Sequence, residues 1–141
     1  MCGIIGIQNN SEAATLAYMG LYAQQHRGQE GAGVVSSDGT VLHRHMGQGL
    51  VADVFSDSAV FDSLIGDSAI GHVRYSTTGN SDPKNVGPLT FNMGDYSLSI
   101  AHNGNLVNLD EIRKELQENG VLFQTSTDTE IIIHLLAREK G

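Results

Sequence analysis

The chain opens Met1-Cys2-Gly3-Ile4-Ile5-Gly6-Ile7, and Cys2 is its only cysteine. Isoleucines between glycines predict a short buried strand over residues 3–8. Removal of Met1 would leave a thiol and a free α-amine on one residue. Because both groups titrate near neutral pH, they can exchange a proton, and Cys2 would be a nucleophile that carries its own base. The alternative is that Cys2 only packs as a small hydrophobe at the start of that strand.

Composition fits one domain and excludes several classes of function. The chain has 141 residues, 40% of them hydrophobic, and a net charge of −8 without any run of Lys or Arg, which argues against nucleic acid and anionic membrane as partners. No signal segment or long apolar stretch is present, so a cytoplasmic protein is expected. One cysteine excludes an intrachain disulfide. The six histidines show no ligand spacing, so no metal site is expected.

Hydrophobic periodicity predicts an α+β fold of hairpins and flanking helices. The expected strands are residues 3–8, 32–37, 40–46, 69–75, 89–93 and 96–102, with a possible further strand over 121–125. The expected helices are residues 12–25, 108–120 and 127–139, with one or two short helices within 51–65. The last two long helices each start with a sequence typical of a capping box, Asn108 with Glu111 and Thr127 with Glu130.

Four polar clusters lie in turns or at strand ends, where binding groups gather. Arg27 either ends a helix and its turn or belongs to a site. Arg74 ends a buried strand, and its guanidinium needs either an internal acid or a ligand carboxylate. The pair Asn103-Gly104 is either a plain turn or a source of oxyanion donors. Asp128 either favours the dipole of its helix or receives a ligand ammonium.

Together with Cys2, these clusters supply every part that hydrolysis of an amino-acid side-chain amide requires. Their motifs resemble those of class II glutamine amidotransferase domains, the N-terminal nucleophile type, from residue 2 to about 137. The matching stretches are Cys2-Gly3-Ile4-Ile5-Gly6-Ile7, LYAQQHRGQEGAG at 21–33, GHVRY at 71–75, AHNGNL at 101–106 and TDTE at 127–130.

The resemblance implies a role for each residue of the clusters. Cys2, once Met1 is removed, would attack the side-chain amide of glutamine, release ammonia and form a thioester that water cleaves to glutamate. Asn103 and Gly104 would stabilise the oxyanion. Arg74 would bind the α-carboxylate of glutamine and Asp128 its α-amine. Thr77 and Arg27 would shape the pocket.

The resemblance also implies a fold, the N-terminal nucleophile hydrolase type, with antiparallel β-sheets packed between helical layers. Residues 1–141 are then expected to be the N-terminal portion of a longer, here truncated, domain, with apolar faces left exposed. The motifs are most similar to those of enzymes that deliver ammonia to 5-phosphoribosyl pyrophosphate in purine synthesis. A phosphoribosyltransferase domain that uses Mg²⁺ would lie outside this chain, no cofactor is expected within it, and the full-length enzyme is expected to be a homo-oligomer.

Two other interpretations stay open at the level of sequence. The chain could be a catalytically silent fragment or interaction module with the same fold. A general thiol redox role is disfavoured because no second cysteine could resolve a disulfide.

Overall fold

The computed structural model describes residues 1–76 and 82–139. A four-stranded antiparallel sheet has the order β1-β4-β2-β3, and β5 and β6 pair as a separate hairpin. The strands are β1 (Gly3–Ile7), β2 (Gly31–Ser37), β3 (Leu42–Gln48), β4 (Ser68–Arg74), β5 (Leu89–Met93) and β6 (Tyr96–Ile100). The helices are α1 (Ala13–Ala23), α2 (Val51–Val54), α3 (Val60–Ser63), α4 (Leu109–Glu118) and α5 (Asp128–Arg138), with the short 3-10 turns η1 (Gln25–Arg27) and η2 (Pro83–Asn85).

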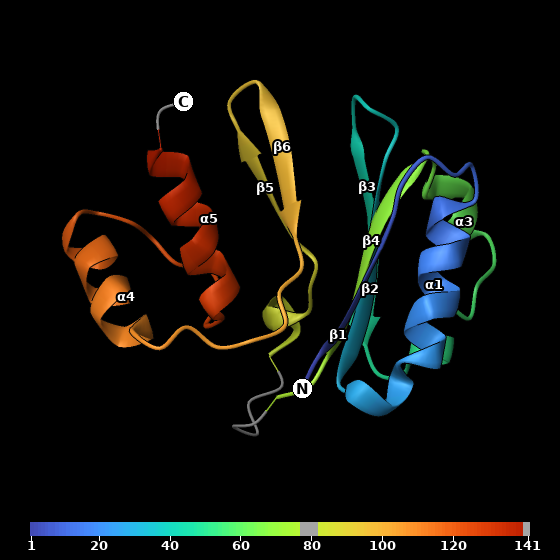
Figure 1. The fold of residues 1–141 in the computed structure, drawn as a ribbon, viewed down its shortest axis with the longest axis horizontal. Helices are drawn as coiled ribbons and strands as arrows, with labels where there is room; N and C mark the ends of the chain where they lie inside the picture. Colours follow the sequence, from blue (N-terminus) through green and yellow to red (C-terminus); the bar gives the residue numbers. More distant parts are fainter. Residues whose placement is uncertain (77–81, 140–141) are drawn as a thin grey trace.

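These elements form four layers. Figure 1 shows α1 and α3 on one side of the four-stranded sheet, the β5–β6 hairpin on the other side, and α4 and α5 beyond the hairpin. The predicted α+β class, with antiparallel sheets between helical layers, is therefore confirmed. The ambiguous region 51–65 contains two short helices, α2 and α3.

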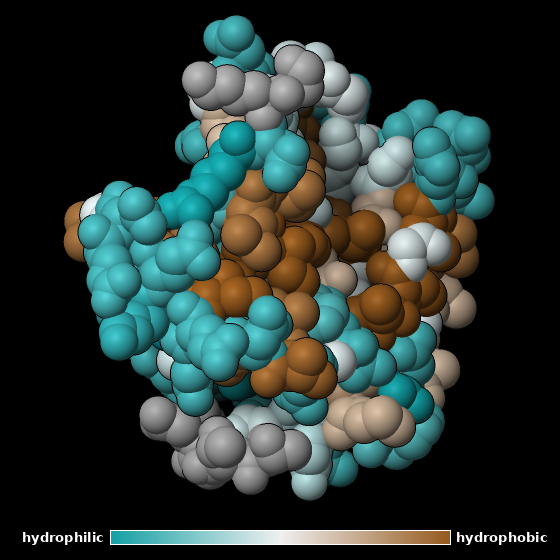
Figure 2. All heavy atoms as spheres, turned by 60° about the vertical axis from the view of Figure 1, so that its left-hand side comes forward, coloured by the Kyte–Doolittle hydropathy of each residue, from teal (hydrophilic) through white to brown (hydrophobic). Residues whose placement is uncertain are grey.

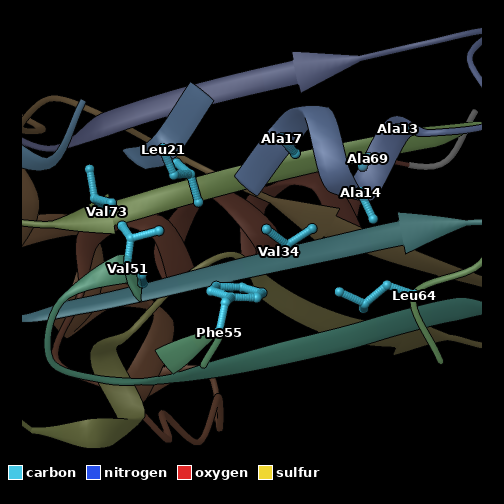
Figure 3. Close-up of a cluster of buried hydrophobic side chains, with 11 residues drawn as sticks. Ala13, Ala14, Ala17, Leu21, Val34, Val51, Phe55, Leu64, Ala69 and Val73 are labelled. Atoms are coloured by element: carbon cyan, nitrogen blue, oxygen red, sulfur yellow. The ribbon is translucent and has the colours of Figure 1, made fainter. Parts of the chain in front are cut away.

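The main core lies between α1 and the four-stranded sheet, as Figure 3 shows. The side chains of Ala13, Ala17 and Leu21 have no exposed surface and recur every four residues, so they form one stripe along α1. Small residues bring this helix close to the strands. A Cβ on Gly20 would meet the Cδ1 end of the Ile5 side chain, so Ile5 would have to move to admit a larger residue where α1 crosses β1.

Strand register brings the start of the chain to the end of β4. Gly3 lies opposite Val73 in the β1–β4 pair, and Gly31 lies opposite Arg74 in the β2–β4 pair. Cys2 and Arg74 are therefore neighbours at the same end of the paired strands β1 and β4, although 72 positions separate them in the sequence.

The predicted strand over residues 121–125 is wrong. This segment pairs with no strand in the described part of the chain, because side chains bind its main chain instead. The Glu130 carboxylate accepts hydrogen bonds from the amides of Gln124 and Thr125, at 2.9 and 2.7 Å, and Arg113 donates to the Thr125 carbonyl at 3.3 Å. Glu130 therefore does not act as the reciprocal half of a capping box, and Thr127, although at the cap position, makes no side-chain cap bond.

Part of the apolar surface lies outside the core, as expected from the sequence. Figure 2 turns the left-hand side of Figure 1 toward the viewer. This face shows a broad hydrophobic area between hydrophilic regions. Large hydrophobic side chains that are exposed in the described residues include Tyr96, Val107, Leu122, Leu135 and Leu136. None of the described helices is both long and apolar enough to cross a membrane.

Candidate active site

Five segments that are separate in sequence line one cavity of about 250 Å³. They are the start of the chain, the end of β4, the η2 turn with the residues after it, the end of β6 with the loop after it, and the start of α5. The cavity is lined by Cys2, Arg74, Gly104 and Asp128, so four of the seven predicted site residues meet there.

Main-chain groups hold Cys2 at this cavity. The Tyr75 amide donates a hydrogen bond to its Sγ at 3.4 Å, and the thiol can donate to the Tyr75 carbonyl at 3.6 Å. Arg27 Nε donates to the Cys2 carbonyl oxygen at 3.1 Å. Arg27 therefore acts on the backbone of the candidate nucleophile, and Cys2 is fixed from both sides rather than packed as a core hydrophobe.

Arg74 has an acid beside it but is not saturated by it. Its Nε lies 3.9 Å from the Glu30 carboxylate, at the outer limit of an ion pair, and neither of these two buried atoms has a hydrogen-bond partner within residues 1–76 and 82–139. Its Nη1 donates to the Asn85 carbonyl oxygen at 3.1 Å. The side chain is 17% exposed, so a largely buried cation lines the cavity with hydrogen-bonding capacity to spare.

Asp128 supplies the opposite charge as the first residue of α5. One carboxylate oxygen accepts the Leu106 amide at 3.2 Å, and the other lies 3.4 Å from His102 Nδ1. These contacts fasten the loop after β6 to the start of the helix. The negative charge also lies at the N-terminus of α5, where the unpaired backbone N–H groups stabilise it.

The other predicted residues differ in their position. Gly104 lines the cavity, whereas Asn103 is exposed and does not line it. Thr77 falls in 77–81, outside the described residues. Of the oxyanion pair, the structure thus brings only Gly104 to the cavity.

Two buried polar residues at the cavity were not predicted as site residues. His72 lies two positions before Arg74 on β4, so strand alternation places both on one face. Burial, followed by the charge of Arg74, lowers the pKa of His72 from 6.5 to about 4, and its Nδ1 has no hydrogen-bond partner among the described residues. Asn85 is 3% exposed and bonds to Ser126, a pair that no local sequence pattern indicates.

Titratable side chains do not gather as a metal site in the described part of the chain. Within residues 1–76 and 82–139, no group of three or more His, Cys, Asp or Glu side chains could hold a metal ion. The groups that line the cavity include a thiol at Cys2, a cation at Arg74 and an anion at Asp128.

Comparisons with known proteins identify the family of the chain. A family model described as "Glutamine amidotransferase domain" matches residues 56–141. The amidophosphoribosyltransferase of Lacticaseibacillus casei is 44% identical over 140 residues, which cover 99% of this chain and 72% of that protein. Amidophosphoribosyltransferase 2, chloroplastic, of Arabidopsis thaliana is 54% identical over 141 residues, and the match covers 99% of this chain and 25% of that protein.

A solved structure shows the same fold at similar identity. The glutamine phosphoribosylpyrophosphate (PRPP) amidotransferase from B. subtilis, complexed with ADP and GMP, superposes with a TM-score of 0.91 and 44% identity. The match covers all of this chain and 30% of that one. The chain thus spans about a quarter to a third of most of these relatives, and it belongs to the glutamine amidotransferase domain family.

Proposed function

We propose that residues 1–141 are the N-terminal portion of a domain that hydrolyses glutamine to glutamate and ammonia through a thioester on Cys2. One observation carries the proposal: the thiol of Cys2 borders the same cavity as one largely buried cation, Arg74, and one anion, Asp128. The α-carbon of glutamine carries the matching pair, a carboxylate and an ammonium. Charges of opposite sign in one small cavity would orient the substrate with its side-chain amide toward the sulfur.

Binding precedes the chemistry. The Arg74 guanidinium offers a planar donor set to the α-carboxylate, the geometry in which arginine binds carboxylates in pairs of hydrogen bonds. Asp128 accepts from the α-ammonium. The contact between the Asp128 carboxylate and His102 is long, at 3.4 Å, so Asp128 can exchange it for a closer contact with the substrate ammonium.

The proposed reaction then has two halves. With Met1 removed, the α-amine of Cys2 takes the thiol proton and the sulfur attacks the amide carbon. The carbon–nitrogen bond breaks, the ammonium returns its proton to the leaving nitrogen, and ammonia departs from a γ-glutamyl thioester. Water, deprotonated by the same amine, adds to the thioester, and glutamate leaves as the thiol is regenerated.

The tetrahedral intermediates place a negative charge on the former carbonyl oxygen. The backbone of Gly104 borders the cavity and is the proposed donor to this oxygen. Asn103, exposed in this structure, would join it by rotating its side chain inward. Arg27, through the Cys2 carbonyl, keeps the nucleophile in line, and Thr77 remains a proposed contributor to the pocket wall.

The names of the relatives support a destination for the ammonia. We propose that the protein containing this chain is an amidophosphoribosyltransferase, which passes ammonia to 5-phosphoribosyl pyrophosphate in a further domain. In this proposal Mg²⁺ serves that domain, residues 1–141 use no cofactor, and the full-length enzyme is a homo-oligomer in the cytoplasm. A reducing compartment would keep the thiol of Cys2 available.

The decisive test replaces Cys2 with alanine in the full-length protein. Glutamine-dependent synthesis of phosphoribosylamine should fall by about a thousandfold or more, because the nucleophile is gone, while synthesis from free ammonia continues. Intact mass should show that active wild-type protein lacks Met1. Glutamine turnover in Cys2→Ala, or full activity with Met1 retained, would refute the proposal. A wild-type protein that keeps Met1 and turns over no glutamine would instead be the silent module.

A further inference from the structure

Asn85 is a buried amide at the start of a buried run, residues 85–89. It ends the η2 turn at 3% exposure, whereas Pro83 and Lys84 before it are exposed. Its own amide donates to the Asp82 carbonyl at 2.9 Å. The Asp82 carboxylate caps the same turn by accepting from the Lys84 amide at 3.0 Å. This short, doubly bonded turn fixes where Asn85 lies.

The side chain of Asn85 makes a reciprocal pair with Ser126. Its Nδ2 donates to the Ser126 hydroxyl at 2.8 Å, and the Ser126 amide donates back to its Oδ1 at 3.2 Å. Both residues line the cavity. A buried amide that is satisfied on its donor and its acceptor side holds two chain segments in one relative position.

The main chain of Asn85 holds the cation of the site. Its carbonyl oxygen accepts from Arg74 Nη1 at 3.1 Å. The Glu30 carboxylate, at 3.9 Å from Arg74 Nε, is too distant to fix the guanidinium by a hydrogen bond. In the described residues, Asn85 is therefore the partner that sets the position of Arg74.

Ser126 in turn leads to the anion of the site. It lies two residues before Asp128, and the segment that carries it is fastened to α5 by the bonds from Gln124 and Thr125 to Glu130. One residue, Asn85, thus connects the Arg74 guanidinium through its backbone and the Asp128 segment through its side chain.

We infer that Asn85 is a positioning residue that sets the spacing between Arg74 and Asp128, and so the preference of the site for ligands with both an α-carboxylate and an α-ammonium. The inference rests on the proposed glutamine site. A ligand with both groups gains from a fixed spacing because neither contact has to be rebuilt when the other forms. A ligand with a carboxylate alone gains little, because the Arg74 side chain can adjust to that one group without any second contact to keep.

The test uses Asn85→Ala in the full-length enzyme. The KM for L-glutamine should rise about tenfold, the scale expected for losing a reciprocal pair of buried hydrogen bonds, while kcat changes less than about twofold. The inhibition constant of glutarate monoamide, which lacks the α-amine, should change less than about threefold. Ser126→Ala should act in the same direction, and the double variant should be no worse than Asn85→Ala, because both remove one interaction.

Asn92→Ala is the matched control. Asn92 is an exposed residue of β5 whose Oδ1 accepts from the Ser97 hydroxyl at 2.7 Å, so it loses a side-chain hydrogen bond far from the site and should keep the wild-type KM. Should Asn85→Ala fail to fold, Ser126→Ala and the conservative Ser126→Thr, which keeps the hydroxyl, carry the test, with a raised KM expected only for alanine.

Three results would overturn the inference while leaving the proposed function intact. The KM for glutamine could stay within twofold of wild type in the Asn85 or Ser126 variants. The glutarate monoamide constant could rise as much as that KM, which would indicate a general loss of the cavity. The two substitutions could have fully additive effects. A wild-type enzyme without glutaminase activity would instead remove the proposed function itself.

Discussion

Replacing Glu130 with glutamine should loosen the segment that leads into α5. The side chain of Glu130 is 1% exposed, and its carboxylate accepts from the Gln124 amide at 2.9 Å, the Thr125 amide at 2.7 Å and the Thr125 hydroxyl at 2.6 Å. His134 lies 3.4 Å away. Every neighbour within hydrogen-bonding distance is thus a donor or can be one, which is the environment of an ionised acid.

The magnitude follows from these contacts. Glutamine keeps one acceptor oxygen but turns an NH₂ group toward a donor, so it forfeits at least one bond to a charged group and leaves a buried N–H or O–H unpaired. Such bonds contribute roughly 1.5–3 kcal/mol, and an unpaired buried group costs a similar amount. We expect the free energy of local unfolding at the 124–127 segment to fall by about 3 kcal/mol.

Amide hydrogen exchange at Gln124 and Thr125 measures this directly, since exchange requires local opening. At neutral pH, Glu130→Gln should accelerate it about 150-fold, the factor that corresponds to about 3 kcal/mol. Glu118→Gln is the matched control, because Glu118 is exposed on α4 and lies 3.9 Å from Lys114. In this variant, exchange at Gln124 and Thr125 should stay within about threefold of the wild-type rate. An equally small effect from Glu130→Gln would refute the reasoning.

The pH dependence provides an independent check. Burial by itself would raise the pKa of Glu130, but the hydrogen bonds from Thr125 and Gln124 outweigh it, and the pKa lies below its usual 4.5. The folded state therefore binds the proton more weakly than the unfolded chain does. The stabilisation is complete above about pH 5 and is lost as the pH falls through the lowered pKa. The difference between wild type and Glu130→Gln should shrink accordingly below pH 4.5.

Two further substitutions, at Gly28 and at His72, test the residues packed around Arg74. Gly28→Ala would place a Cβ 2.5 Å from the Arg74 carbonyl oxygen, so it should raise the KM for glutamine and lower the melting temperature by a destabilisation of about 1–3 kcal/mol. Gly6→Ala meets nothing within 4 Å and should leave both unchanged. His72 stays neutral when folded down to about pH 4 but protonates near 6.5 when unfolded. As the pH falls from 6.5 to 4, the free energy of unfolding, measured with urea, should decrease by about 3 kcal/mol more in wild type than in His72→Gln. Equal decreases in the two proteins would contradict this account.

Sequence patterns predicted the sheets well because they report local burial. The isoleucines of β1 and the apolar run of β4 indicated strands, and Cys2, Arg74 and Asp128 could be selected because each lies at the end of an element. That the three meet depends on the β1–β4 register and on the layering of α5, which involve pairs more than 50 residues apart. Local periodicity carries no information about such pairs.

The errors have a common physical origin. The apolar and β-branched residues of 121–125 favour a strand, but the Glu130 carboxylate takes the amides that a strand would pair. Asn85 and Ser126 lie in turn-rich segments where amides and hydroxyls usually serve their own turns, so their mutual bond across 41 positions could not be inferred. In both cases a polar side chain binds a segment whose own sequence gives no sign of that bond, and the bond overrides local preference.

The distance in sequence between the nucleophile and the two charges has a consequence for biosynthesis. Cys2 is made before Arg74 and Asp128, which complete its surroundings 72 and 126 residues later. At usual translation speeds that interval is on the order of 10 s. A polypeptide arrested before residue 128 would therefore carry the thiol of Cys2 without the anion that is proposed to bind the substrate ammonium.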